Sequence, residues 1–160
     1  MDSATRTSTV TTPSDREIRI ERVFDAPRER VWRAMTEPDL VAQWWGRGHP
    51  LDVERLEVEP GGHWRFVEHT PEGSAEGFEG RYREVTPPER AVQTFEWDGM
   101  PGSVSLETAN LKDLGAGRTK LTVDALYLTA TERDGMLGSG MQAGMDESYT
   151  ALDAVLARIC

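Results

Sequence analysis

The chain has 160 residues, of which 38% are hydrophobic and 29% charged, a composition typical of a globular domain. A chain of this length buries about 70% of the surface that its unfolded form exposes, so it can form a core without disulfides or metals. The formal net charge of -10 opposes binding to nucleic acid and to anionic membrane surfaces, and no apolar run approaches the roughly 18 residues of a membrane span.

The first sixteen residues are rich in Ser and Thr and lack the apolar segment of a secretory signal. We therefore expect a disordered N-terminal tail over residues 1–16 and one domain over residues 17–160. The single cysteine, Cys160, is the last residue, so no internal disulfide can form and a catalytic thiolate is not expected. This cysteine usage favours a cytoplasmic protein.

Residues 17–24 alternate apolar and charged side chains up to an irregularity at the end, which predicts a half-buried strand. Pro27 then suits the first position of a helix. That helix should end by Glu37, because the residue before Pro38 is pushed out of the helical region. A second short helix is expected over residues 39–44, closed by Gly46.

The segment from residue 51 to residue 127 combines alternating patterns with turn residues, which predicts a series of short strands. The short connections between them favour antiparallel pairing. The expected strands are Asp52–Glu57, His63–His69, Ala75–Val85, Ala91–Trp97, Ser103–Leu111 and Thr119–Tyr127.

The C-terminal segment predicts a helical region that begins at Thr129, because Thr129 and Glu132 have the spacing of a capping box. Glycines weaken its first half, and we expect a break near Gly138. Beyond the break, one apolar helix face comprises Met141, Met145, Tyr149, Leu152, Leu156 and Ile159. This face must pack on the sheet, which predicts an α+β fold.

The order and spacing of several short motifs carry a family resemblance: Phe24-Asp25-Ala26-Pro27, Val31-Trp32, Trp44-Trp45-Gly46, Pro60-Gly61-Gly62, Pro87-Pro88-Glu89-Arg90, Gly117-Arg118-Thr119 and Ser139-Gly140-Met141. Over about residues 17–159 the chain resembles the START-like, or SRPBCC, superfamily. Within it, the chain is most similar to the branch named after the activator of heat-shock-protein-90 ATPase. The resemblance implies a helix-grip fold: a curved antiparallel sheet of about six to seven strands around a long C-terminal helix, two short helices after strand one, and an apolar cavity.

The superfamily includes carriers of lipids and sterols, hormone receptors, polyketide aromatases and cyclases, and co-chaperones, so the fold does not select one activity. The eukaryotic activator has a separate N-terminal chaperone-binding domain, whereas sixteen polar residues precede the expected fold here. We therefore do not expect stimulation of a chaperone ATPase.

Aromatic and methionine side chains on the expected inner faces indicate a binding cavity, since methionine adapts to varied ligands and tyrosine adds a polar tip. Our leading hypothesis is that the protein binds a small hydrophobic molecule, such as a lipid, a sterol or a polycyclic aromatic compound, without catalysis. The candidate ligand-binding residues are Trp45, Trp64, Phe66, Glu68, Phe78, Tyr82, Met141, Met145 and Tyr149.

Two carboxylates support a second hypothesis, an enzyme of the polyketide cyclase or aromatase type. If Trp64 and Phe66 point inward, so does Glu68, and Glu107 shares a face with Ala109 and Leu111. A carboxylate that faces an apolar hollow has a raised pKa and can move protons. The alternative is that each carboxylate is turned to solvent or paired with an arginine. A third hypothesis is a protein-interaction module, acting on a chaperone or as a homodimer.

The sequence contains no recognisable catalytic motif, so we assign no catalytic residue, and we expect no cofactor. The three histidines are His49, His63 and His69. The last two would lie about 20 Å apart on one strand, too far to share a metal ion, so no metal site is expected.

Overall fold

One antiparallel sheet of eight strands dominates residues 8–159, the part of the chain that this computed structural model describes. The strands are β1 (Thr9–Thr11), β2 (Glu17–Phe24), β3 (Leu51–Leu56), β4 (His63–His69), β5 (Ala75–Thr86), β6 (Arg90–Trp97), β7 (Val104–Gly115) and β8 (Arg118–Leu126). Their spatial order is β1-β2-β8-β7-β6-β5-β4-β3. The helices are α1 (Arg28–Thr36), α2 (Pro38–Val41), α3 (Ala130–Leu137) and α4 (Met141–Arg158). The expected α+β class is confirmed.

The predicted disordered tail over residues 1–16 was wrong for its second half. Residues 9–11 form β1, which pairs with β2 so that Thr9 lies opposite Glu21 and Thr11 opposite Arg19. All three residues of β1 are β-branched and favour extended backbone, and Val10 packs against the core. This strand is the reason that the sheet has more strands than expected. The first seven residues and Cys160 lie outside the described residues.

The helical boundaries follow local chemistry closely. Pro27 is the N-cap, with ψ at 154°, one residue before the first helical position at which it was expected. Helix α1 ends at Thr36, so that Glu37 is its C-cap ahead of Pro38, as expected. Helix α2 is shorter than predicted, covering only Pro38–Val41. The capping box is confirmed, since the Glu132 backbone N–H donates to Thr129 Oγ1 at 3.1 Å, and α3 ends before Gly138.

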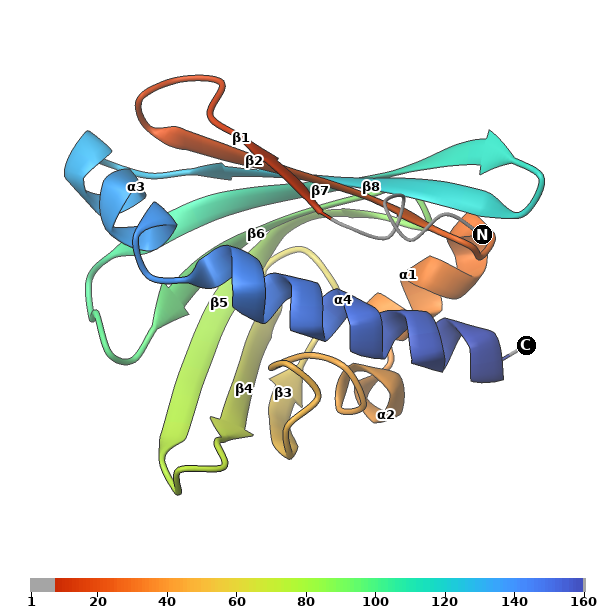
Figure 1. Ribbon diagram of the computed structural model, residues 1–160, viewed down its shortest axis with the longest axis horizontal. Helices are drawn as coiled ribbons and strands as arrows, with labels where there is room; N and C mark the ends of the chain where they lie inside the picture. The colour runs from red at the N-terminus through yellow and green to blue at the C-terminus, as the bar shows by residue number, and fades with distance from the viewer. Residues whose placement is uncertain (1–7, 160) are drawn as a thin grey trace.

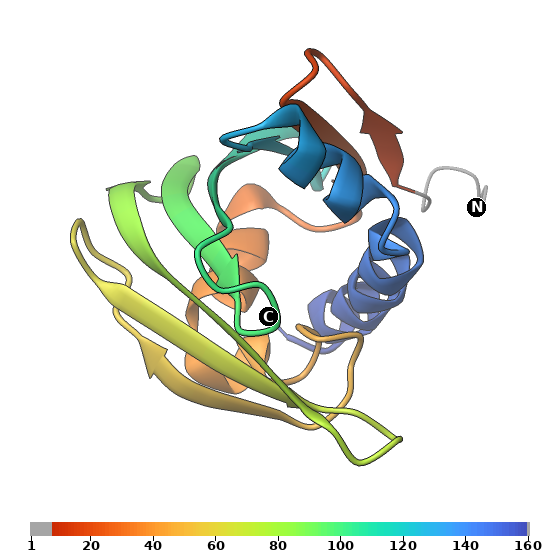
Figure 2. The ribbon, with the colours of Figure 1, turned by 90° about the vertical axis from the view of Figure 1, so that its left-hand side faces the viewer.

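The sheet curves strongly, and α4 lies across its concave side (Figures 1 and 2). Figure 2 shows α1 and α2 on the same side of the sheet as α4. Side chains from β2, β8, α1 and the C-terminal half of α4 form the main core. Its fully buried members include Ile18, Leu121, Leu152 and Val155. This packing fixes the helix against one half of the curved sheet.

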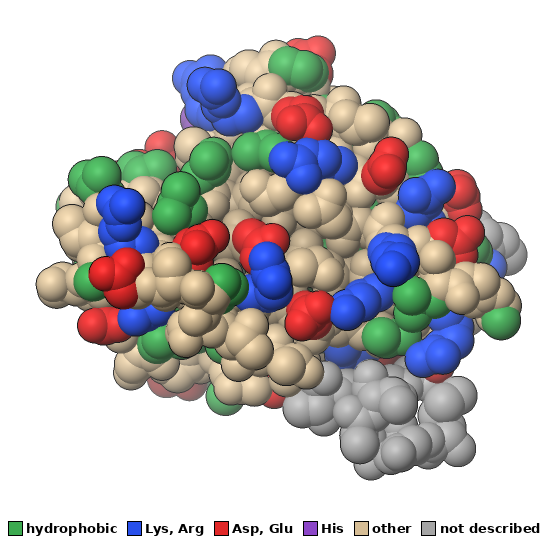
Figure 3. Space-filling view, turned by 90° about the horizontal axis from the view of Figure 1, so that it is seen from above, with side chains coloured by type: hydrophobic (Ala, Val, Ile, Leu, Met, Phe, Trp, Pro, Cys, Tyr) green, Lys and Arg blue, Asp and Glu red, His purple; other side chains and the backbone are tan. Residues whose placement is uncertain are grey.

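The outer face of β2 and β8 is charged. Arg19 pairs with Asp124 at 2.6 Å, and Lys120 pairs with Glu21 at 2.7 Å. Figure 3 shows acidic and basic side chains interspersed on this side of the molecule. The alternation of these residues with buried ones fixes which face of the sheet turns toward α4. None of the helices in residues 8–159 is long and apolar enough to cross a membrane.

Candidate functional site

Glu107 lies in the middle of the concave face of the sheet. The register places it opposite Gln93 on β6 and Ala125 on β8. Because side chains alternate along β7, Glu107 shares its face with Ala109 and Leu111, as the sequence predicted. The carboxylate therefore points to the side of the sheet that α4 covers.

The surroundings of Glu107 are unusual for a carboxylate. No hydrogen bond or ion pair joins its side chain to any group in residues 8–159. Burial raises the pKa of Glu107 from 4.5 to about 7, because removal from water disfavours the charged form. The residue nevertheless keeps part of its surface accessible. The side chain is therefore turned toward the interior without being completely covered by the protein.

Two tyrosines share this part of the interior. Burial raises the pKa of Tyr149 on α4 and of Tyr127 just after β8, and the charge of Glu107 raises both further. Both residues are buried, with 7% of their surface exposed. The interior thus holds a carboxylate and two phenol hydroxyls from three separate elements.

Most side chains between the sheet and α4 are apolar, and they are packed unequally along the helix. In the C-terminal half of α4, Leu152 and Val155 have no exposed surface. In the N-terminal half, Met141 and Met145 are only half-buried, although they contact the core. On the sheet, Ala109 and Val123 point inward and are also half-buried. The first turns of α4 are therefore covered less completely than its C-terminal half.

The predicted ligand-binding residues fall into two groups. One group is an aromatic cluster under β4, β5 and β6, in which the ring of Trp45 lies 5.0 Å from Phe66 and 5.0 Å from Phe78. The Trp64 ring lies 4.9 Å from Phe66. Tyr82 belongs to this cluster, and burial raises its pKa to about 12. These rings pack mainly against one another.

The second group is Met141, Met145 and Tyr149, which belongs to the main core around α4. The Tyr149 ring packs edge-on against Phe24, with centroids 5.5 Å apart, and lies 6.3 Å from the Trp44 ring. Trp45 contacts both groups and joins them. The predicted residues therefore surround the interior from two sides.

Glu68 faces inward, with 4% of its surface exposed, but its carboxylate is occupied. Its Oε2 accepts hydrogen bonds from Arg47 Nε at 3.2 Å and Nη2 at 3.0 Å, and lies 2.8 Å from His49 Nδ1. Pairing with an arginine was one of the alternatives for this residue, and it is the arrangement observed. Glu68 anchors the loop at residues 46–50.

This loop also fastens to α4. The Arg47 backbone N–H donates to Ser148 Oγ at 2.8 Å. Gly46 has φ of +73°, and a Cβ at this position would lie 3.2 Å from Glu68 Cγ. Glycine is therefore required both by the left-handed backbone and by the close approach of Glu68. Through these bonds to Glu68 and Ser148, the loop at residues 46–50 contacts both the end of β4 and α4.

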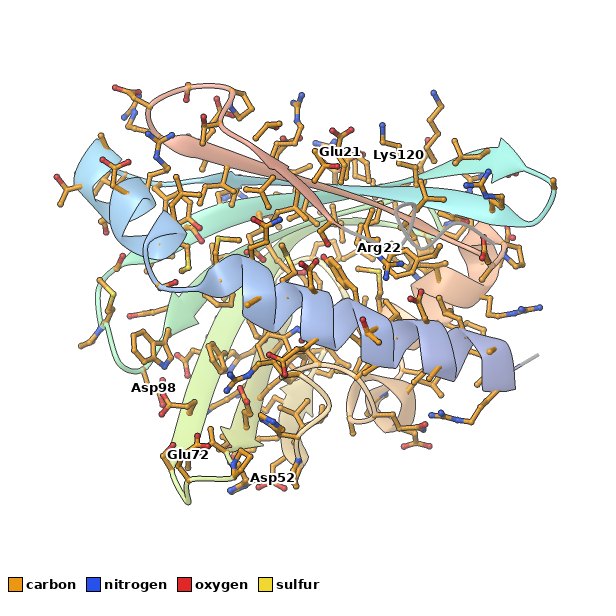
Figure 4. All side chains as sticks on the ribbon, in the orientation of Figure 1. Glu21, Arg22, Asp52, Glu72, Asp98 and Lys120 are labelled. Carbon is orange, nitrogen blue, oxygen red and sulfur yellow. The ribbon has the colours of Figure 1, made fainter. Side chains whose placement is uncertain are left out.

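Sequence reasoning missed three polar residues of the interior. Gln93 lies on the inner face of β6, and Tyr127 follows β8. Arg22 is 2% exposed and forms a two-pronged ion pair with Asp153 of α4, at 3.0 and 2.8 Å (Figure 4). The available signal was periodicity, since Arg22 continues the buried series of Ile18 and Ile20.

Neither the histidines nor the acidic residues form a metal centre within residues 8–159, where no three potential ligands come together. A hollow of about 280 Å³ does lie on the opposite, outer face of β4–β7. Its lining includes His63, Arg81, Glu96 and Val104. The sheet separates this outer hollow from Glu107.

A curved antiparallel sheet that holds a C-terminal helix across its concave face defines a helix-grip protein of the SRPBCC type. Residues 25–157 match the family described as activator of Hsp90 ATPase homolog 1-like protein, and the chain belongs to this family. None of the curated proteins is significantly similar in sequence.

Solved bacterial structures share the fold. A crystal structure from Rhodobacter sphaeroides is 31% identical, with a TM-score of 0.86, and the match covers 96% of this chain and 99% of that one. A solution structure from Arthrobacter aurescens is 24% identical, with a TM-score of 0.84 and coverage of 95% and 92%. A crystal structure from Chromobacterium violaceum is 27% identical, with a TM-score of 0.77 and coverage of 90% and 99%.

Proposed function

We propose that the protein binds a small hydrophobic molecule, such as a lipid, a sterol or a polycyclic aromatic compound, between the concave face of the sheet and the first half of α4. The observation that carries this proposal is the unequal packing of α4. Leu152 is fully buried, whereas Met141 and Met145 keep accessible surface although they face the core. A ligand there would cover this apolar surface at about 25 cal/mol per Å² before the costs of association.

The two groups of predicted residues take different roles in this proposal. Met141, Met145 and Tyr149 contact the ligand from the helix, while the half-buried rings of Trp45 and Phe78 border it from the aromatic cluster. The more deeply buried residues of that cluster, Trp64, Phe66 and Tyr82, support these rings from behind. Glu68 acts indirectly, because it holds the loop at residues 46–50, which contacts both β4 and α4.

Native mass spectrometry tests the proposal. The purified protein is incubated with the neutral hydrophobic compound N-phenylnaphthylamine and measured under native and denaturing conditions. We expect one molecule of the compound per protein in the native spectrum and its release on unfolding. Absence of any complex at saturating compound, for this and for a neutral sterol, would contradict the proposal.

Glu107 favours a second candidate, a proton-transferring enzyme of the cyclase or aromatase type. Its carboxylate is enclosed, has no partner in residues 8–159, and has a pKa of about 7, which suits a general base near neutral pH. In this candidate Glu107 removes a proton next to a substrate carbonyl, and the hydroxyl of Tyr149 donates a hydrogen bond to the carbonyl oxygen.

Deuterium exchange distinguishes the enzyme from the carrier. The protein is incubated in heavy water with tetralone, a hydrophobic bicyclic ketone, and deuterium incorporation beside the carbonyl is followed by NMR. An enzyme accelerates the exchange in a saturable way, and the Glu107→Gln variant loses that acceleration. Equal rates with the wild type, the variant and buffer alone would exclude this candidate for tetralone-like substrates.

A further inference from the structure

The carboxylate of Glu107 has no ion-pair partner among residues 8–159. The residues opposite it on the neighbouring strands are the neutral Gln93 and Ala125. No hydrogen bond or ion pair joins its carboxylate to a cation in residues 8–159, and burial is the cause of its raised pKa. A buried charge whose partner is missing costs several kcal/mol, and a cation that arrives with a ligand removes this cost.

The other charged groups that act on Tyr149 already have partners. Arg22, which lowers the pKa of Tyr149, is held by Asp153 through two hydrogen bonds. Asp146 of α4, which also acts on Tyr149, accepts a hydrogen bond from the Ser8 backbone N–H at 3.3 Å. Arg22 is therefore not released to neutralise Glu107, and Asp146 carries the same sign of charge as Glu107. Glu107 thus offers a ligand a carboxylate that no group in residues 8–159 pairs.

The groups around Glu107 suit a ligand that carries a positive charge. The oxygens of Tyr127 and Tyr149 can accept hydrogen bonds from an ammonium group, and the aromatic ring of Phe95 lies on the same concave face, opposite Ser105. The protein as a whole carries a formal charge of -10, which attracts cations to it. The charge, the hydrogen-bonding capacity and the aromatic surface therefore all favour a cationic ligand group.

We propose that the interior site selects hydrophobic molecules that carry a protonated amine, and that Glu107 is the residue that binds the ammonium group. This inference rests on the proposed function, because it requires that a ligand enters the hollow. It adds the chemical class of the polar end of the ligand. The apolar remainder lies against Met141 and Met145.

Calorimetric titration of the full chain with matched compounds tests the inference. The probes are naphthylmethylamine, which is cationic, naphthylmethanol, which is neutral, and naphthoate, which is anionic. At about pH 8 we expect the amine to bind at least tenfold more tightly than the alcohol, as a hydrogen bond to a charged group allows, and naphthoate to bind most weakly. Glu107→Gln should abolish the preference for the amine and leave the affinity for the alcohol within about twofold.

Glu72→Gln is the matched control, because it removes one negative charge from an exposed turn far from the interior (Figure 4). It should keep the amine preference. If the Glu107→Gln variant fails to fold, the wild type itself provides the test: the preference should weaken as the pH falls below about 7, where Glu107 is protonated while the amine stays charged.

The outcomes separate the two proposals. Binding of the alcohol and the amine with equal affinity would overturn the amine selectivity and leave the hydrophobic site intact. An amine preference that survives in Glu107→Gln would also overturn it, because another group would then be responsible. If none of the three probes binds and N-phenylnaphthylamine does not bind either, both proposals fail.

Discussion

Glu107 of β7 and Tyr149 of α4 lie close enough across the interior for the charge of the carboxylate to raise the pKa of the phenol. They belong to the sheet and to the helix, so their proximity depends on the whole fold. Tyr149 is buried and Glu107 is half-buried, and the half-buried Met141 and Met145 lie on the same helix as Tyr149. Variants of these residues and of their neighbours can therefore test the stability, the ligand binding and the proposed chemistry of the protein.

The pH dependence of stability should report Glu107 directly. Its pKa is raised from 4.5 to about 7 in the folded protein, so the folded state binds this proton more tightly than the unfolded state. The resulting stabilisation is fully present below about pH 4.5 and is lost as the pH rises through 7, by up to about 3 kcal/mol. Glu107→Gln should therefore be more stable than the wild type at pH 8, as measured by urea unfolding.

The control for this experiment is Glu72→Gln, whose stability should follow the wild type at every pH. Profiles for wild type and Glu107→Gln that run parallel between about pH 5 and pH 8 would mean that Glu107 keeps an ordinary environment. In that case the carboxylate would not border an enclosed hollow.

Met145→Trp should fill the proposed ligand site under the first turns of α4. The larger side chain occupies volume that the proposed ligand needs, so the affinity for N-phenylnaphthylamine should fall about tenfold or more while the protein stays folded. Fluorescence titration measures the affinity, and circular dichroism checks the fold. Met100→Trp, at an exposed position near the β6–β7 turn, should bind like the wild type. Unchanged affinity in Met145→Trp would place the ligand elsewhere.

Gly46→Ala should destabilise the protein more than Gly61→Ala does. Both glycines have a left-handed backbone, which costs an alanine about 1–2 kcal/mol. A Cβ at residue 61 meets nothing within 4 Å, whereas a Cβ at residue 46 lies 3.2 Å from Glu68 Cγ and disturbs its bonds to the loop. We expect a further loss of about 1 kcal/mol at Gly46 in thermal unfolding. Equal losses would show that Glu68 does not anchor the loop.

Asp153→Asn should cost about 3 kcal/mol, because it leaves the buried guanidinium of Arg22 without its negative partner. Asp124→Asn removes a comparable partner from Arg19 on the solvent-exposed face, and its cost should stay below about 1 kcal/mol. Chemical denaturation of the two variants gives both values. Similar losses for the two would mean that Arg22 is hydrated in solution.

The sequence predicted most of the architecture because local chemistry determines it. Alternation placed β4 at its observed bounds and put Glu107 on the same face as Ala109, and the capping box at Thr129 marked the start of α3. The strand at residues 9–11 was missed because its stability comes from pairing with β2 and from the contact of Val10 with the core, neither of which has a local signature.

The candidate site was less predictable, since it depends on contacts between distant segments. Glu68 and Glu107 were equivalent on sequence, as both share a face with apolar residues. The difference is that the loop at residues 46–50 brings Arg47 and His49 to Glu68, while nothing comparable reaches Glu107 within the described residues. Arg22 could not be interpreted without Asp153, which lies 131 residues later in the chain.

NMR of the methionine methyl groups tests the central claim, that a hydrophobic ligand occupies the hollow under α4, most directly. The protein is labelled at its methionine methyls and titrated with N-phenylnaphthylamine. We predict saturable shifts for the methyls of Met141 and Met145, which are half-buried against the core, and an unchanged signal for the exposed Met100. Shifts confined to Met100, or no shift at all at saturating compound, would contradict the account.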